Sequence, residues 1–285
     1  MKKREKLEKD IIKKISETLT IGNRSQRTID NYKSSINRFI NYYQNKNLKK
    51  ITESDIINYL KIEILDKNKT PQTYNANLFA IKYMYSVYFN KKFNDDLLPV
   101  AKLDKTLPYI VSKEIFLKII NNENNIKHKC ILLLAYCSGL RVSEIATIKI
   151  QDIQSSIHKL KVYGKGKKER YTILPDITIK YLRLYYKEQK MKKKKGYLFE
   201  GISNKEHINS KSISNYFTSL KDKYDLSDEI TAHTFRHSFA TNFIKAGGEP
   251  FVLKTLLGHK TMTTTSMYVH LADNYDNLIG DSNAK

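Results

Sequence analysis

The sequence predicts a mainly α protein with one small antiparallel β-sheet, an α+β fold divided into two domains. Apolar residues recur at spacings of three and four along most of the chain, which is typical of amphipathic helices. Residues 158–175 instead alternate polar and apolar side chains on both sides of a Gly-Lys-Gly turn, which indicates a β-hairpin. A chain of 285 residues, 40% of them hydrophobic, is long enough for two domains, since one domain takes about 100–200 residues. We expect a helical domain over residues 1–93, a linker over 94–110 and a second domain over 111–285.

The first domain is expected to contain only helices. Residues 1–20 have the pattern of a charged helix with a thin apolar stripe. Thr28 is the predicted cap of a firmer amphipathic helix. Thr52 opens another helix with a capping-box pattern, and Thr70 caps a third that has Pro71 at its first position. The pattern then breaks in a segment with two prolines, which predicts the linker.

The second domain is predicted to combine helices with the hairpin. A capped helix covers residues 112–120, a strongly apolar one runs up to Gly139, and another begins near Val142. After the hairpin the chain is mostly helical again from residue 176. Cys130 and Cys137 are seven residues apart on one face of the apolar helix, so a buried structural role is favoured over a disulfide or a metal site.

The charge of the chain indicates a polyanionic partner. The formal net charge is +22, and such an excess does not stabilise a fold. A nucleic-acid phosphate backbone is the leading candidate, because Lys and Arg release its counterions on binding. An acidic membrane surface and a bias of genomic base composition are the alternatives. No apolar run reaches the roughly 18 residues of a membrane span, and the basic N-terminus lacks an apolar signal region, so we expect a cytoplasmic protein with no membrane partner.

Two segments of the second domain place cations at backbone turns. In "SGLRVSE", Arg141 stands at the entrance of a helix, where free N–H groups and the helix dipole favour an anion. In "GKGKKER", Lys165 lies between two glycines at the predicted hairpin turn. Taken singly, a surface arginine in an ion pair and a polar hairpin tip explain these residues as well.

A third segment, "AHTFRHSFATNFIKAGG", places His233 and Arg236 on one face of a helix. Phenylalanines spaced by four from Phe235 form the predicted core-facing stripe, so this pair is expected to point away from the core. Two groups that can both be positive favour an anion between them. His237 is interpreted as peripheral.

A fourth segment, "LLGHKTMTTTSMYVH", brings a histidine and a tyrosine close in sequence. Gly258 ends a helix, His259 follows at once and Tyr268 comes nine residues later. A short helix over 263–268, acting as a mobile tether, would return Tyr268 to the site of His259, and Tyr268 would then be dispensable for folding. His270 is interpreted as incidental.

Together these segments resemble the catalytic set of the tyrosine recombinase (phage integrase) family. The similarity is greatest to Xer-type recombinases and to short integrases of mobile elements, and it covers about residues 20–275. Each motif alone is weak, and their order on one chain is specific. The matching residues are Arg141, Lys165, His233, Arg236, His259 and Tyr268.

The resemblance implies DNA strand transesterification by Tyr268. A phenol has a pKa of about 10, so it needs cations or a proton acceptor in order to attack at neutral pH. Arg141 and Arg236 would bind the scissile phosphate, and no metal or other cofactor is expected, because this pair supplies the charge. The product would be a 3′-phosphotyrosyl bond and a free 5′-hydroxyl, and two rounds of exchange would pass through a Holliday junction.

The remaining residues receive supporting roles from the same resemblance. His233 and His259 would donate hydrogen bonds to the phosphate, and His233 would also accept the tyrosine proton. Lys165 would protonate the leaving oxygen. Glu144 is expected to hold Arg141 or His233, with a plain helix position as the alternative.

The resemblance also implies the partners. A SAM-like core-binding domain and the catalytic domain would clamp double-stranded DNA that carries paired half-sites. Four protomers would assemble on two sites, and accessory or directionality proteins are possible partners. An amphipathic patch at the C-terminus is a candidate for docking on a neighbour; it contains Leu271, Tyr275, Leu278 and Ile279.

Three other functions stay open at this point. A type IB topoisomerase-like enzyme uses similar chemistry on one duplex. A non-catalytic DNA-binding protein could share the fold, and a basic helical nucleic-acid binder could carry the motifs by coincidence. The target sequence, and the choice between chromosome-dimer resolution, integration, excision and inversion, are not encoded in recognisable residues.

Overall fold

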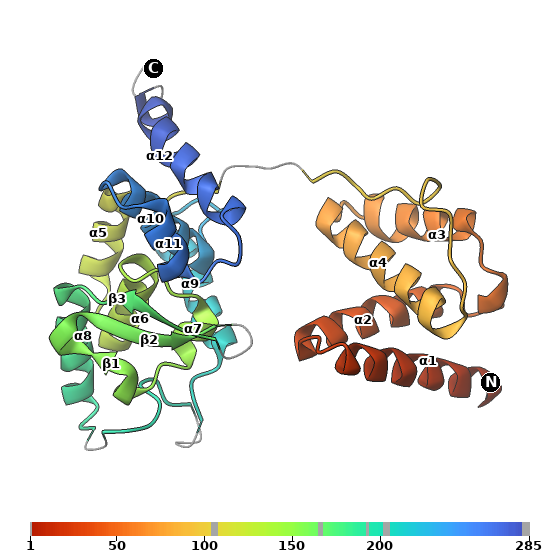
Figure 1. Cartoon of the computed structure of the whole chain (residues 1–285), viewed down its shortest axis with the longest axis horizontal. Coiled ribbons are helices and arrows are strands. Elements are labelled where there is room, and N and C mark those ends of the chain that lie inside the picture. The colour runs from red at the N-terminus through yellow and green to blue at the C-terminus, as the bar shows by residue number, and fades with distance from the viewer. Residues whose placement is uncertain (1, 104–107, 165–167, 192–193, 202–205, 281–285) are drawn as a thin grey trace. The chain divides into compact units, whose positions relative to one another are not determined.

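The structure, a computed structural model, is mostly helical with a three-stranded antiparallel sheet, as the sequence predicts (Figure 1). It describes residues 2–103, 108–164, 168–191, 194–201 and 206–280. The chain divides into two compact units, Met1–Lys105 and Thr106–Lys285. Within the described residues, no helix combines the length and the apolar character that crossing a membrane requires.

Among its described residues, the first unit has four α-helices, and two of them have the predicted caps. The Thr52 side chain accepts a hydrogen bond from Asp55 N, the Asp55 carboxylate accepts one from Thr52 N at 2.9 Å, and Thr70 caps the helix that Pro71 opens. The helices are α1 (Lys2–Ile21), α2 (Gln26–Tyr42), α3 (Glu53–Leu60) and α4 (Pro71–Tyr88).

The predicted start of α2 is wrong by one turn. Ser25 is the cap, because its hydroxyl accepts from Thr28 N at 3.3 Å, and Thr28 lies in the first turn. Ser and Thr are both favoured N-cap residues, and the spacing of the apolar residues does not choose between these two positions.

The core of the first unit takes side chains from all four helices and from the segment after them. Ile11 and Ile15 place the charged first helix in this core, and Leu98 from the predicted linker is also buried. The Asn75 side chain fixes the same segment, donating to Ala101 O at 2.9 Å and accepting from Ala101 N at 2.8 Å. Residues up to 101 therefore belong to the first unit, although their sequence pattern is that of a linker.

In the part of the chain that the structure describes, the second unit places eight α-helices around the sheet. Its helices are α5 (Lys113–Asn122), α6 (Ile126–Tyr136), α7 (Val142–Ala146), α8 (Asp176–Glu188), α9 (Ser210–Tyr224), α10 (Ala232–Lys245), α11 (Pro250–Leu257) and α12 (Thr263–Gly280). The predicted hairpin is confirmed as β2 (Lys159–Tyr163) paired with β3 (Glu169–Ile173). A two-residue strand, β1 (Ile153–Gln154), adds to β2 and is too short for any periodicity to predict.

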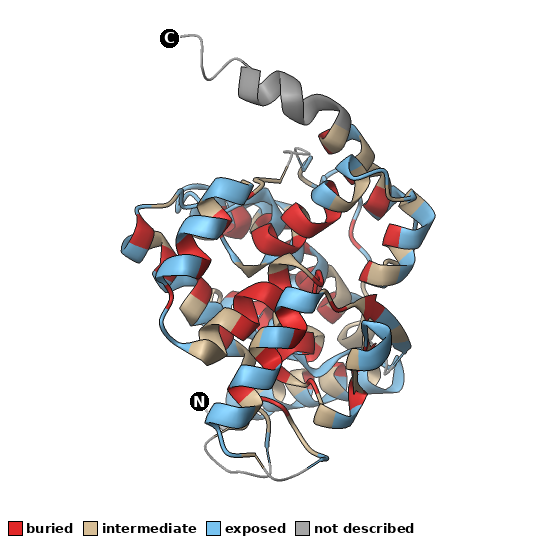
Figure 2. Ribbon diagram, turned by 90° about the vertical axis from the view of Figure 1, so that its left-hand side faces the viewer, coloured by how far each residue is buried: buried red, intermediate tan, exposed pale blue. Residues whose placement is uncertain are grey.

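Helix α6 is the centre of the main core and packs against α8 and α10. Figure 2 shows the buried sides of the helices facing inward and the exposed sides facing out. Cys130 is buried and Cys137 half-buried, and both are free thiols. Burial raises the pKa of Cys137 to about 11, so its thiol stays protonated and unreactive at neutral pH.

A second, smaller cluster joins α10, α11 and α12. Phe239, Leu257 and Tyr268 are buried in it, whereas Phe235 packs in the main core. The phenylalanines of α10 face the protein interior, as predicted, but they pack in two different clusters, so this helix is buried on several sides. The prediction that Arg236 points away from the core is wrong, because only 4% of this residue is exposed.

Candidate active site

A cleft of about 930 Å³ opens between the start of α7, the β2–β3 hairpin and the end of α11. Arg141 and Glu144 line it from α7, Arg170 from β3, and His259 from the turn after α11. Helix α11 packs directly on β3 (Figure 1). Residues from three separate segments therefore line the cleft. Lys168 and Lys260 add further positive charge.

Arg141 is fixed at its base and open to the cleft. It is the N-cap of α7, and its backbone N–H donates to Glu144 Oε2 at 2.9 Å. Its Nη1 donates to Glu144 Oε1 at 2.9 Å and reaches Leu257 O at 3.4 Å. The side chain is 34% exposed, so part of the guanidinium remains available to an anion.

Arg236 is buried behind Arg141 and held by backbone carbonyls. Its Nη1 donates to Gly139 O, and its Nη2 donates to Leu257 O at 2.6 Å. Burial and the charge of Arg141 lower the pKa of Arg236 to about 9, which leaves it a cation at neutral pH. Gly139 turns its carbonyl toward Arg236 in a left-handed conformation with φ +64°.

Glu144 is the shared partner of three arginines. Arg170 binds it with both terminal nitrogens, at 2.7 and 2.9 Å, and Arg236 lies 3.6 Å away. Burial alone would raise the pKa of Glu144, yet the hydrogen bonds and charges of Arg170, together with Arg236, hold it below its usual value. Three guanidinium charges against one carboxylate leave an excess of two, which suits a phosphate.

The prediction that Glu144 holds Arg141 agrees with these contacts, whereas the sequence did not predict Arg170 as a site residue. The position of Arg170 in the predicted hairpin could have indicated it. Strand residues two apart face the same side, so Arg170 shares the inward face of β3 with the buried Thr172.

His259 lies beside Arg236 at the end of α11. Its Nε2 is 3.5 Å from Arg236 Nη2, and its Nδ1 is 3.0 Å from Thr265 Oγ1. Since Arg236 can only donate, this network assigns the ring proton to Nδ1. Burial, followed by the charges of the arginines, lowers the pKa of His259 to about 4, so the ring is neutral at neutral pH.

Tyr268 lies between two histidines and is only 2% exposed. Its hydroxyl is 2.9 Å from His237 Nδ1, and its ring stacks on His259 with the centroids 6.1 Å apart. Burial raises the pKa of Tyr268, although the nearby charges of Arg236 and Arg141 oppose this. The phenol is therefore protonated at neutral pH.

Two predictions about this segment are corrected. Residues 263–268 are the first turns of α12, and Thr265 is fully buried, so they are no free tether. His237 is not peripheral, since its ring meets the tyrosine hydroxyl. The spacing of four between His233 and His237, which places them on one helix face, was the available signal.

The two remaining predicted catalytic residues are His233 and Lys165. His233 is exposed one turn before His237, and its charge adds to burial in lowering the pKa of His237 to about 4. Lys165 lies outside the described residues, while its neighbours Gly164 and Lys168 line the cleft. The structure thus brings Arg141, Arg236, His259 and Tyr268 together, and the role of Lys165 stays a prediction.

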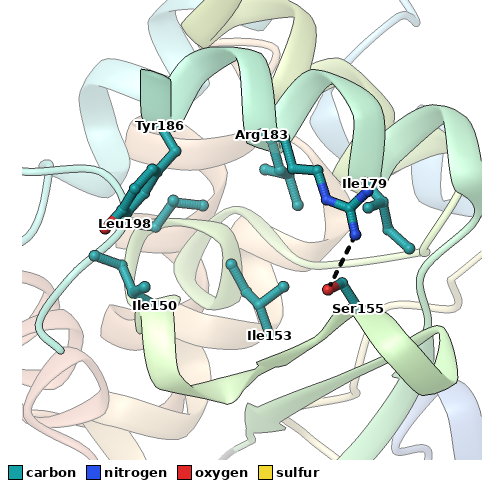
Figure 3. A pocket seen from close by; sticks show the side chains of 8 residues that line it. Ile150, Ile153, Ser155, Ile179, Arg183, Tyr186 and Leu198 are labelled. Atoms are coloured by element: carbon teal, nitrogen blue, oxygen red, sulfur yellow. Dashed lines mark hydrogen bonds between the residues drawn. The ribbon is translucent and has the colours of Figure 1, made fainter. Parts of the chain in front are cut away.

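A separate apolar pocket of about 250 Å³ lies between α8 and the residues around β1 (Figure 3). Ile150, Ile153 and Leu198 line it, and Arg183 reaches Ser155 Oγ at 3.4 Å across its edge. None of the predicted catalytic residues that the structure describes lines this pocket. The cleft is therefore the candidate active site.

Comparisons with known proteins give the family. The model of the Phage integrase family matches residues 111–275, and that of the Phage integrase N-terminal SAM-like domain matches residues 11–95. Tyrosine recombinase XerC of Psychromonas ingrahamii is 30% identical over 257 residues, covering 86% of this chain and 85% of that protein. Tyrosine recombinase XerD of Oceanobacillus iheyensis is 27% identical over 263 residues, covering 87% of this chain and 88% of that protein.

Solved structures share the fold. The XerH site-specific recombinase bound to palindromic difH substrate has a TM-score of 0.74 and 18% identity, covering 92% of this chain and 82% of that one. The lambda integrase dimer bound to a COC′ core site has a TM-score of 0.71 and 20% identity, covering 91% and 94%. With a family match over more than half of its length, the chain belongs to the phage integrase family of tyrosine recombinases.

Proposed function

We propose that the chain is a site-specific DNA recombinase in which Tyr268 attacks a phosphodiester. The Tyr268 oxygen forms the new bond to phosphorus, the bond to the 5′-oxygen breaks, and a 3′-phosphotyrosyl ester and a free 5′-hydroxyl result. The observation that carries this proposal is the position of the Tyr268 ring against His259, near two arginines whose charge one carboxylate does not balance.

Arg141 and Arg236 would bind the non-bridging oxygens of the phosphate. Both are held in place before DNA arrives, by Glu144 and by the carbonyls of Gly139 and Leu257. Donors that need no reorganisation stabilise the charge of a transition state most effectively. An arriving phosphate would also raise the pKa of His259 from its low value and favour an N–H donor at that ring.

The proton of Tyr268 needs an acceptor during the attack. His237 Nδ1 is already within hydrogen-bond distance, and His233, one turn away, is the acceptor that the family resemblance implies. Lys165 is proposed to protonate the leaving 5′-oxygen. The ester keeps the energy of the phosphodiester, so a second 5′-hydroxyl can rejoin the strand without ATP.

Double-stranded DNA with paired half-sites is the proposed substrate, and a homotetramer on two sites is the proposed assembly. The net charge of +22 supports a DNA partner. The DNA-bound recombinases that share the fold support it further. The exchange would pass through a Holliday junction.

The test of this proposal is whether the protein becomes covalently attached to DNA. Duplexes bound by a Tyr268→Phe variant are first selected from a random pool. A nicked suicide duplex that carries the selected sequence is then incubated with each protein and run on a denaturing gel. We expect a DNA-shifted band with the wild-type protein and none with Tyr268→Phe, since phenylalanine has no nucleophile. An equal adduct in the variant, or none in the wild type, would contradict the proposal.

The same proteins separate recombination from the topoisomerase alternative. We expect no relaxation of a supercoiled plasmid that lacks the selected site. Relaxation of that plasmid would support a type IB-like enzyme instead.

A further inference from the structure

Arg170 belongs to the cleft, yet its hydrogen bonds are made to the protein. Its Nε donates to Leu256 O at 2.7 Å, and its two terminal nitrogens donate to Glu144 at 2.7 and 2.9 Å. The side chain is 8% exposed, against 34% for Arg141. A residue placed in this way is suited to holding the site and not to reaching the DNA.

The contacts of Glu144 show what Arg170 does for its neighbours. Arg170 binds both carboxylate oxygens, Arg141 binds Oε1 with one terminal nitrogen, and Arg236 remains 3.6 Å from Oε2. A buried carboxylate needs a partner, because leaving it unpaired is costly. With Arg170 in place, Glu144 has that partner without a hydrogen bond from Arg236.

Arg170 also reaches the end of α11. Its Nε bonds the Leu256 carbonyl in the last turn, where a cation interacts favourably with the helix dipole. A Cβ on Gly258 would come within 3.0 Å of Arg170 Cδ, so the side chain packs closely on the turn that leads to His259. One side chain on β3 therefore joins the hairpin, the start of α7 and the end of α11.

We propose that Arg170 is a positioning residue for strand cleavage. It neutralises and orients Glu144, so that this carboxylate holds Arg141 and does not compete with the DNA phosphate for Arg236. Without Arg170, Glu144 and the phosphate share two guanidinium groups, and the excess of positive charge falls by one. This inference rests on the proposed function.

The experiment measures the rate of adduct formation on the suicide duplex at saturating protein, and DNA affinity separately. We expect Arg170→Gln to cleave about 100-fold more slowly, as is typical when reacting groups are slightly misplaced. Affinity should change little, since Arg170 does not contact DNA in this proposal. Arg170→Lys keeps the charge but cannot bind both carboxylate oxygens with a planar guanidinium. Its cleavage rate should lie between the rates of the wild-type protein and of Arg170→Gln.

The deciding variant is E144Q/R170Q. A neutral glutamine at position 144 no longer competes for Arg236, so the double variant should cleave faster than Arg170→Gln alone. A purely structural role would make the double variant as slow as Arg170→Gln or slower, and this result would overturn the inference.

Arg183→Gln is the matched control, because Arg183 lies on α8 beside the apolar pocket outside the cleft, and it should keep the wild-type rate. Circular dichroism of every variant checks its folding. A wild-type rate in Arg170→Gln would overturn this inference alone. Failure of the wild-type protein to form an adduct would overturn the proposed function, and this inference with it.

Discussion

At the residue scale, the ring and the hydroxyl of Tyr268 have different roles. The ring fills the cluster between α10, α11 and α12, so the prediction that Tyr268 is dispensable for folding applies to the hydroxyl and not to the ring. Removing a buried aromatic ring costs about 3–5 kcal/mol, whereas Phe at this position keeps the packing. Phe is therefore the substitution that tests chemistry without emptying the core.

We expect the histidines around Tyr268 to make the stability of the protein depend on pH. His237 and His259 have a pKa of about 4 in the folded protein, against about 6.5 for an unfolded histidine. Between these values only the unfolded chain binds the protons, so the free energy of unfolding should fall as the pH falls from about 6.5 to 4.

Denaturant titrations from pH 7 to pH 5 measure this dependence. The variant His237→Asn/His259→Gln should lose less stability over that range than the wild type does. The exposed His270→Gln is the control and should behave as the wild type. An identical pH dependence in the double variant would show that other groups cause it.

At the element scale, short turns between helices position the arginines. The turn after α6 passes through Gly139, and its carbonyl binds Arg236. A Cβ at Gly139 would lie 2.3 Å from Phe239 Cδ1, in addition to the strain of the positive φ. The glycine therefore allows α6, α10 and the site arginine to meet at one point.

We expect Gly139→Ala to be destabilised by about 2–4 kcal/mol, from the left-handed strain together with overpacking. Gly247→Ala is the matched control: its φ is also positive, at +82°, but among the described residues no atom lies within 4 Å of its Cβ position. That variant should lose only about 1–2 kcal/mol, from strain alone. Thermal and denaturant unfolding measure both, and equal losses would contradict the packing argument.

At the scale of the whole molecule, we expect the positive charge to govern DNA binding. With a net charge of +22, DNA affinity should fall steeply with salt, by a slope of about −0.9 in log K against log salt for each phosphate neutralised. Fluorescence anisotropy between about 50 and 200 mM salt measures this slope. The Arg170→Gln variant should keep the wild-type slope, since Arg170 binds Glu144 and not a phosphate. A flat response would show that charge does not drive binding.

What the sequence determined by itself is local. Helix periodicity, the caps at Thr52 and Thr70 and the alternation of the hairpin depend on neighbouring residues, and these predictions are confirmed. The order of the motifs also indicated the family, because the order and spacing of motifs can be read from the sequence without knowledge of the fold.

The tertiary structure decided which side chains meet. Arg170 and Glu144 are 26 residues apart, and His237 and Tyr268 are 31 apart. Two further contacts are equally non-local. Asn75 bonds Ala101 of the predicted linker, and in the second unit Ser238 accepts from Val111 N at 2.8 Å. Periodicity reports which face of an element is apolar, but the partner of a buried polar group depends on how the elements pack. For that reason the tyrosine, most of the cations and the carboxylate of Glu144 could be named from the sequence. The roles of Arg170 and His237, and the backbone carbonyls that hold Arg236, could not.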